Sequence, residues 1–288
     1  MRSFRNNLNI VVFTCAIFGF QNWALAKVET TLGSLSIKSN PNLAAALPVT
    51  NNSEILISRS QYVLSYNKER RTPNWVAWKV ESKDIGKTGR TNMFDVDPDL
   101  DKYLGTLTPK QHAVSSADYT GSCFDRGHQA PSADRSDAVE NNQATFLMSN
   151  MIPQTPYLNR VIWEHLEQHT RNVIQTQNKK AYVIAGPIYD QNFGAIGPKS
   201  DIQVPSKDFK VVVFLDAKQT PADINAKSDM IAVIMPNTLE NGTPHIVGTA
   251  CIPFVADPNE DTSDWQKYQT TLADVEKQAG IHLFPKNN

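Results

Sequence analysis

Short apolar runs recur through the middle of the chain and predict β-strands. Two of them, 62–66 and 75–80, are rich in β-branched and aromatic residues and are joined by the polar segment 67–74. This pattern predicts an antiparallel pair of strands. Three further apolar runs are bounded by Pro, Gly, Asp or Asn, and they predict strands over 181–185, 209–215 and 230–235.

Helical spacing appears at three places. Over 157–177 it is marked by Leu158, Ile162, Leu166, His169 and Val173, which predict a long amphipathic helix behind Pro156. Shorter helices are expected over 140–148 and over Leu272–Ala279, the latter ended by Gly280. Because strands and helices are mixed without strict alternation, we expect an α+β domain with a central antiparallel sheet flanked by helices.

The first 26 residues differ from the rest. Arg2 and Arg5 precede an apolar run over 10–20, and the small residues Ala24 and Ala26 follow it. This is the layout of a cleavable secretory signal peptide, and the run is shorter than the ~20 residues that span a bilayer. We therefore expect a signal peptide over 1–26, export to the periplasm or the medium, and no membrane attachment after cleavage.

The remaining chain is expected to form one domain. Residues 27–55 are rich in Ser, Thr and Asn and predict an irregular lead-in, while 56–288 contain no internal repeat, low-complexity linker or charge block. The 28 Lys and Arg, 29 Asp and Glu and 40% hydrophobic residues exclude a disordered chain and a protein that coats nucleic acid by bulk positive charge. Loss of Arg2 and Arg5 leaves 26 basic against 29 acidic residues, a formal charge of −3.

Signal cleavage would leave two cysteines, Cys123 and Cys251. An even pair in an exported chain favours a disulfide, with two buried free thiols as the alternative. In the chain-entropy description, closing so long a loop stabilises the fold by about 4–5 kcal/mol.

The residues best suited to chemistry lie between 125 and 167. The run from Asp125 to Pro131 is followed by the block 148–154, and then by Asn159 and Glu167 in the predicted helix. An imidazole with a pKa near ~6.5 can accept a proton from water at neutral pH. A guanidinium forms paired hydrogen bonds with phosphate, and an amide oxygen beside a carboxylate suits Mg²⁺. The grouping therefore indicates phosphodiester chemistry.

These blocks resemble the DNA/RNA non-specific endonuclease family, whose sugar-non-specific nucleases carry a ββα-metal finger active site. The resemblance runs from about Leu56 to Pro285 and includes the segments 75–77, 186–189 and 272–276. It implies an enzyme that hydrolyses phosphodiester bonds of DNA and RNA without marked sequence preference, leaving 5′-phosphate ends. It further implies Mg²⁺, for which Mn²⁺ can substitute, and makes a homodimer possible.

The resemblance also implies a role for each matching residue. His128 matches the general base, Arg126 the arginine beside the scissile phosphate, and Asn159 the one direct protein ligand of the metal. Glu167 matches the acidic residue that holds a metal-bound water, and Asn150 a supporting amide. On an ideal α-helix, residues eight apart differ by about 80° around the axis, so Asn159 and Glu167 can border one shallow site.

Other arginines are assigned less directly. Arg90, which precedes Phe94 and Asp97-Pro98, best matches a further arginine of the family. We interpret Arg135 and Arg160 as solvated surface charges. A chain with a formal charge of −3 is expected to bind nucleic acid through a few local phosphate contacts that salt weakens.

Three other functions can be stated from the same residues. One is a catalytically inactive nucleic-acid-binding protein on the same fold. Another is a hydrolase that uses Cys123 or Ser122 as nucleophile with His128, although Gly121-Ser122-Cys123 does not match G-x-S-x-G. The third, a zinc-stabilised module, lacks the C-x-x-C spacing of such sites.

Overall fold

The computed structural model describes residues 28–44, 47–50, 54–225, 227–255, 257 and 261–284. The expected signal peptide over 1–26 and the end of the family resemblance at Pro285 lie outside the described residues. Within the described ranges, no helix has both the length and the apolar character needed to cross a membrane.

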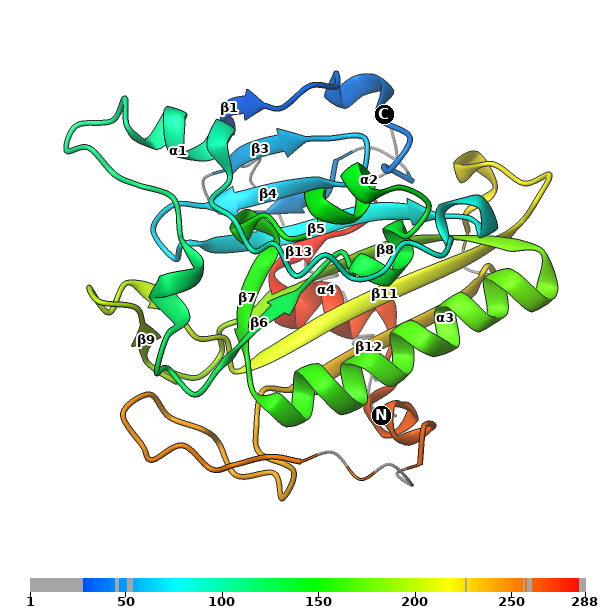
Figure 1. Cartoon of the computed structure of the whole chain (residues 1–288). Helices are drawn as coiled ribbons and strands as arrows, with labels where there is room; N and C mark the ends of the chain where they lie inside the picture. Colours follow the sequence, from blue (N-terminus) through cyan, green and yellow to red (C-terminus); the bar gives the residue numbers. More distant parts are fainter. Residues whose placement is uncertain are drawn as a thin grey trace, which may run out of the picture.

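A seven-stranded sheet in the order β1-β3-β4-β5-β8-β11-β12 forms the centre of the domain (Figure 1). Its strands are β1 (Val28–Leu32), β3 (Glu54–Ser58), β4 (Val63–Asn67), β5 (Thr72–Val80), β8 (Lys179–Ile188), β11 (Lys207–Asp216) and β12 (Asp229–Pro236). All neighbours are antiparallel except β1 and β3, which are parallel. The predicted central antiparallel sheet and the five predicted strands are confirmed.

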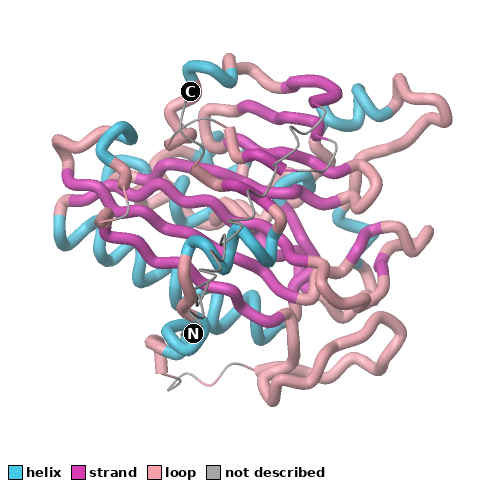
Figure 2. The backbone as a smooth tube through the Cα atoms, turned by 180° about the vertical axis from the view of Figure 1, so that it is seen from behind, coloured by secondary structure: helices cyan, strands magenta, loops and turns pink. Residues whose placement is uncertain are grey.

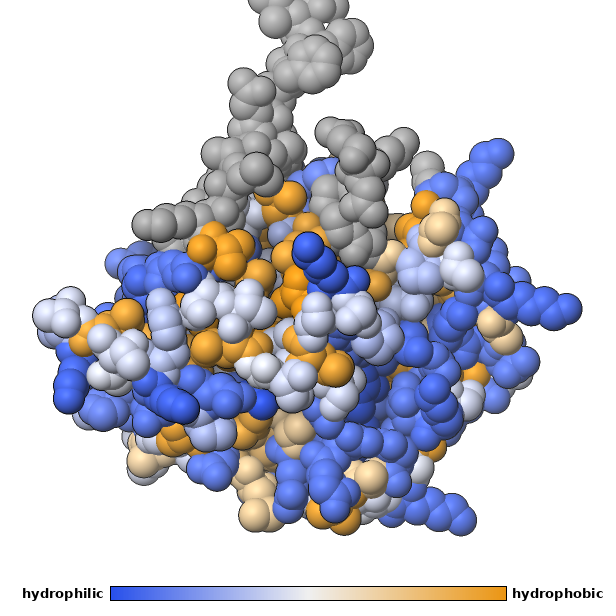
Figure 3. Space-filling model, turned by 90° about the horizontal axis from the view of Figure 1, so that it is seen from above, coloured by the Kyte–Doolittle hydropathy of each residue, from blue (hydrophilic) through white to orange (hydrophobic). Residues whose placement is uncertain are grey.

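The segment 27–55 was expected to be an irregular lead-in, but its described part contains β-strands. β1 is the edge strand of the sheet, and β2 (Val49–Thr50) pairs with β13 (Ile281–His282). β3 begins at Glu54, inside the segment that was expected to be irregular. An edge strand is held by backbone hydrogen bonds on one side and leaves most side chains in solvent, so β1 needs no apolar alternation. Figure 3, viewed from this edge, shows mainly hydrophilic residues with apolar ones in small groups among them.

Alternate residues of the central strands face two separate cores. On β8, Ala181 and Val183 pack with α3 (Trp163–Gln177), whereas Tyr182 and Ile184 pack with α4 (Leu272–Ala279). Figures 1 and 2 show these helices on opposite faces of the sheet. The sheet is therefore covered on both sides.

The other elements are short. The remaining helices are α1 (Pro98–Leu104) and α2 (Val139–Ala144), and the remaining strands are β6 (Asp125–His128), β7 (Met151–Gln154), β9 (Ala195–Ile196) and β10 (Ile202–Gln203). Single 3-10 turns occur at Ile37–Ser39, Ser82–Asp84, Ser116–Tyr119, Ser132–Arg135, Met148–Asn150, Pro221–Asp223 and Asp264–Tyr268. The helix expected over 140–148 ends at Ala144, where Thr145 Oγ1 turns back to donate to the Asn142 carbonyl.

A disulfide joins Cys123 to Cys251 with their Cα atoms 5.3 Å apart, as the cysteine pair predicts. It ties the start of β6 to a segment 128 residues later. The bond uses both sulfur atoms, which removes the thiol that a cysteine nucleophile would need and the thiolates of a zinc module.

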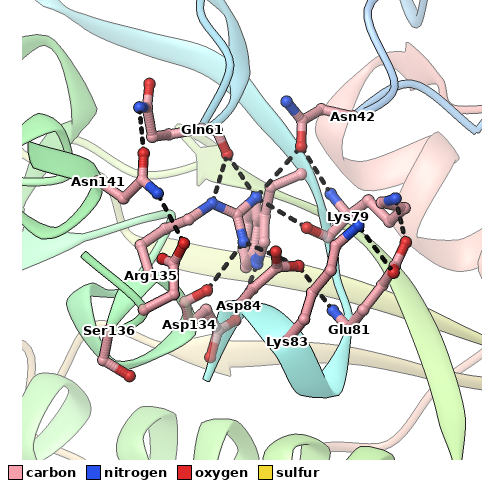
Figure 4. A network of polar contacts seen from close by, with 12 residues as sticks. Asn42, Gln61, Lys79, Glu81, Lys83, Asp84, Asp134, Arg135, Ser136 and Asn141 are labelled. Atoms are coloured by element: carbon pink, nitrogen blue, oxygen red, sulfur yellow. Dashed lines mark hydrogen bonds and ion pairs between the residues drawn. The ribbon is translucent and has the colours of Figure 1, made fainter. Parts of the chain in front are cut away.

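Arg135 is not the solvated surface charge that we expected, because its side chain is 5% exposed. Its guanidinium donates to the backbone carbonyls of Gln61 (2.6 Å), Lys79 (2.7 Å) and Asp134 (2.8 Å), and to Asn42 Oδ1 (3.2 Å). Figure 4 shows these groups converging on the guanidinium. Five donors in a rigid fork can satisfy several carbonyls at once, so Arg135 joins the N-terminal segment to the sheet.

Glu54 of β3 is a buried carboxyl group, and its Oε1 has no hydrogen-bond partner within the described part of the chain. Burial raises the pKa of Glu54 from 4.5 to about 7, while the neighbouring Ser65 and Trp75 side chains lower it by a smaller amount. The unfolded chain therefore ionises at lower pH than the native protein. Stability is lost as the pH rises from 4.5 to about 7 and stays lower above that window.

We expect Glu54→Gln to raise the free energy of unfolding by about 2 kcal/mol above the window and to change it little at pH 4, because the neutral amide avoids burying a charge. Urea unfolding at the two pH values measures the difference. Glu69→Gln, at a carboxyl that is 62% exposed, is the matched control. An equal effect of Glu54→Gln at both pH values would contradict this account.

Candidate active site

The family-like motifs meet in a ββα unit. β6 and β7 are antiparallel, with His128 opposite Met151 and Asp125 opposite Gln154. The chain then enters one π turn (Leu158–Ile162) and continues as α3. The indole Nε1 of Trp163 donates to the His128 carbonyl at 3.2 Å, which fixes the helix against the strand.

The His128 ring packs against two aromatic side chains, which also contact each other. Its centroid is 4.7 Å from Phe146 and 5.6 Å from Phe94, both in edge-to-face geometry. The residue is 7% exposed, and its Nε2 has no hydrogen-bond partner among the described residues. Burial lowers the pKa of His128 well below 6.5, and the cations of Arg90 and Arg126 lower it further. The ring is therefore held neutral, the form in which a histidine can accept a proton.

Two predicted arginines lie beside this ring. The Arg126 guanidinium stacks 4.0 Å from the Phe94 ring centroid and donates to Ser116 Oγ. Arg90 lies 4.8 Å from the Phe146 centroid and donates to Ser132 Oγ at 3.0 Å. Stacking leaves the edges of a guanidinium available, so both cations can donate to a phosphate next to the imidazole.

Asn159 is oriented by Asp125. Its Nδ2 donates to Asp125 Oδ2 at 2.9 Å, and Arg160 donates to both oxygens of the same carboxylate at 2.6 and 2.7 Å. No described residue donates to Asn159 Oδ1, so the amide oxygen is left for another partner. Arg160 is 52% exposed, as expected for a surface charge, but it is held in this ion pair.

Glu167 is held by a buried lysine. Lys210 of β11 is 1% exposed, donates to Glu167 Oε1 at 2.9 Å and lies 3.9 Å from the Trp163 ring centroid. Burial raises the pKa of Glu167, while Lys210 and Arg171 lower it. The carboxylate is therefore fixed in direction from the sheet side, and 11% of the side chain stays accessible.

The helix that carries Asn159 and Glu167 was expected to be α-helical throughout, but its first turn is a π turn. A π turn with i→i+5 hydrogen bonds takes about one residue more than an α turn. Eight residues then approximate one π turn plus one α turn. The angle around the helix axis between the Asn159 and Glu167 side chains is consequently smaller than the about 80° expected for an ideal α-helix.

Asn150 has a positioning role in this structure. The residue is fully buried, its Oδ1 accepts from the Ala130 amide at 3.0 Å, and its Nδ2 donates to the carbonyls of Ala130 and Thr145 at 2.9 Å. The side-chain oxygen and nitrogen of Asn150 are thus hydrogen-bonded to backbone groups, including those of the segment that follows His128. Asn150 supports the loop and does not face the site.

Asp125 and Lys210 were not predicted from the sequence to have a role in the site. Asp125 stood inside the quoted motif, and Lys210 is a charged residue within an otherwise apolar strand. A charged side chain in a buried strand needs a partner of opposite charge. This requirement was the only sign in the sequence that Lys210 has a structural role. Among the described residues, no three His, Cys, Asp or Glu side chains converge as a metal cluster, so a candidate ion site depends on the Asn159 amide.

Comparison with known proteins identifies the family of the chain. The sequence model of the DNA/RNA non-specific endonuclease family matches residues 38–288. A nuclease of Nostoc sp. (strain PCC 7120 / SAG 25.82 / UTEX 2576) is 34% identical over 263 residues, covering 90% of this chain and 84% of the relative. A nuclease of Serratia marcescens is 32% identical over 256 residues, covering 86% and 82%. A chain in the crystal structure of the EndoG/EndoGI complex aligns with a TM-score of 0.59 and 26% identity, covering 81% of this chain and 86% of that one.

The lowered pKa of His128 can be tested by NMR titration of its ring. We expect the midpoint to lie below 6.5 and to rise in Arg90→Gln, because one of the two nearby cations is removed. Arg160→Gln, at an exposed arginine that does not act on His128, is the matched control. A midpoint that does not move in Arg90→Gln would contradict the placement of this cation beside the ring.

Proposed function

Because the chain belongs to the DNA/RNA non-specific endonuclease family, we propose that this nuclease is exported and hydrolyses DNA and RNA at a site built around His128, leaving 5′-phosphate ends. The observation that carries the proposal is the buried imidazole of His128, which lies near the cations of Arg90 and Arg126 and whose Nε2 has no hydrogen-bond partner in the described part of the chain. A neutral base beside two phosphate-binding cations is suited to general-base hydrolysis of a phosphodiester.

In the proposed reaction each side chain has a separate role. His128 takes the proton of the attacking water at Nε2. Arg126 and Arg90 donate to the phosphate oxygens, where negative charge increases in the transition state. Because such donors contact the backbone and not the base edges, they give no sequence preference, and both DNA and RNA are accepted.

The donor set fits a hard divalent cation. Asn159 would hold Mg²⁺ through Oδ1, whose orientation is fixed by the bond from Nδ2 to Asp125. Glu167 would hold it through water, and Mn²⁺ can substitute because it prefers the same oxygen ligands. When bound, Mg²⁺ supplies Lewis-acid stabilisation of charge at the phosphate and the leaving oxygen.

Export is supported by two independent features. The N-terminal sequence has the charge, apolar run and small residues of a signal peptide, and the mature part contains a disulfide. We infer that the mature enzyme works in the periplasm or the medium on DNA and RNA, which it contacts through phosphates.

Digestion of plasmid DNA and of RNA with and without EDTA tests the proposed activity. We expect wild-type protein to cleave both substrates and EDTA to abolish cleavage. His128→Ala should lower kcat by at least about 100-fold, because the proton acceptor is lost. Circular dichroism checks that this variant is folded. Binding of nucleic acid without cleavage by wild type would favour the inactive alternative.

The metal assignment predicts an order of effects. We expect Asn159→Ala to lower activity more than Glu167→Gln, because a direct ligand is lost in the first and a water-mediated contact in the second. Activity is measured over a Mg²⁺ titration, with thermal unfolding to detect loss of the Lys210 pair. Glu164→Gln on the same helix serves as the control. The reverse order would contradict the roles given to Asn159 and Glu167.

A further inference from the structure

The backbone between Arg126 and His128 rests on the side chain of Gln154. Residue 127 is glycine, and a Cβ atom there would lie 2.1 Å from Gln154 Oε1 and 2.4 Å from its Cδ. No other residue type fits without displacing the amide. The position of the Gln154 amide therefore determines how the backbone of β6 lies between two residues of the proposed site.

Gln154 is in turn held by Asp208 of β11. Both residues are fully buried, and Gln154 Nε2 donates to Asp208 Oδ2 at 2.5 Å. Within the described ranges, Gln154 Oε1 and Asp208 Oδ1 have no hydrogen-bond partner. If the carboxyl group were ionised, both orphaned atoms would be acceptors. A buried acceptor without a donor is unfavourable, and a buried charge without a partner is more so.

We propose that Asp208 is a neutral carboxylic acid whose proton on Oδ1 is donated to Gln154 Oε1, which closes an acid–amide pair that positions β6. In this pair one proton satisfies both orphaned oxygens, while Gln154 Nε2 keeps its hydrogen bond to Asp208 Oδ2. The inference rests on the proposed function, since its consequence is the placement of Arg126 and His128. Asp208 and Gln154 are positioning residues and do not touch the substrate.

The surroundings of Asp208 favour the neutral form. Burial raises its pKa from 3.8 to about 8, while the hydrogen bond from Gln154 and the Lys210 ammonium lower it. Lys210 is already paired with Glu167 at 2.9 Å. The Tyr189 phenol also interacts with Asp208 and is hydrogen-bonded to Thr72 at 2.7 Å. The register partners of Asp208 on the neighbouring strands are the uncharged Pro187 and Met235.

Loss of the proton at alkaline pH would remove the second hydrogen bond. Gln154 Oε1, which lies against Gly127, and Asp208 Oδ1 would then both be buried acceptors without a donor. We expect kcat of the wild type to decline as the pH rises through about 8, because β6 loses its fixed support. Substrate affinity should change less, since Arg90, the other proposed phosphate-binding cation, does not lie on β6.

Three variants test the pair through kcat and KM between about pH 6 and pH 10. Asp208→Asn is neutral at every pH and its amide can donate to Gln154 Oε1, so the alkaline decline should disappear. Asp208→Leu cannot form the pair, and kcat should fall at least about tenfold at every pH with a smaller change in KM. Asp216→Asn removes an exposed carboxyl from the end of the same strand and should keep the wild-type pH profile.

Two results would overturn the proposal. One is an alkaline decline in Asp208→Asn equal to that of the wild type, because the carboxyl proton would then be irrelevant. The other is a kcat of Asp208→Asn as low as that of Asp208→Leu, because an ionised carboxylate would then be required.

Thermal unfolding separates this inference from the proposed function. Wild type loses stability as the pH rises from 3.8 to about 8, because the unfolded chain ionises Asp208 first. The Tm of Asp208→Asn should therefore exceed that of wild type by about 5 °C at the alkaline end and by little at pH 4. A gain that does not depend on pH would overturn the acid–amide pair even if the enzyme cleaves both substrates. A pH-dependent gain in a protein without nuclease activity would support the pair and reject the proposed function.

Discussion

The active-site unit is fixed to the sheet by polar side chains that are buried and must therefore be paired. Lys210 and Asp208 project from the same face of β11 into a region without solvent. An unpaired charge or acceptor there would be strongly destabilising, so each side chain accepts only particular partners. Those partners, Glu167 and Gln154, belong to the helix and to the strand β7. Apolar packing alone would permit small shifts of the ββα unit, whereas these contacts define one position.

Around His128 the structure combines two effects that act in the same direction. Burial against Phe94 and Phe146 disfavours a charged ring, and the neighbouring cations of Arg90 and Arg126 disfavour it further. The same cations are suited to an anionic phosphate. In the proposed mechanism, one arrangement thus keeps the base neutral before the substrate binds and supplies compensating positive charge when it does. The Asp125 carboxylate plays the corresponding part for the Asn159 amide by fixing which of its ends is free.

The sequence was sufficient to predict the central strands and the long helix, because they carry strong apolar periodicity. The types and order of His128, Arg126, Asn159 and Glu167 were also distinctive enough to predict them as site residues, and their catalytic and metal-binding roles stay predictions. The sequence did not predict β1, because this edge strand is held by backbone hydrogen bonds to β3 and has no apolar pattern of its own. The burial of Arg135 and the roles of Asp208 and Lys210 depend on partners that are distant in sequence. The π turn at Asn159 likewise has no periodic pattern of its own.

The disulfide has a consequence for the host cell. It fastens the segment around Cys251 to the residue two positions before Asp125, at the margin of the active site. Glutathione and thioredoxin keep such thiols reduced in the cytosol, so the bond forms only in an oxidising compartment. If the enzyme is exported as proposed, this bond would form only after the chain has left the compartment that holds the genome. The chromosome would then be separated from the cross-linked enzyme by redox chemistry as well as by a membrane.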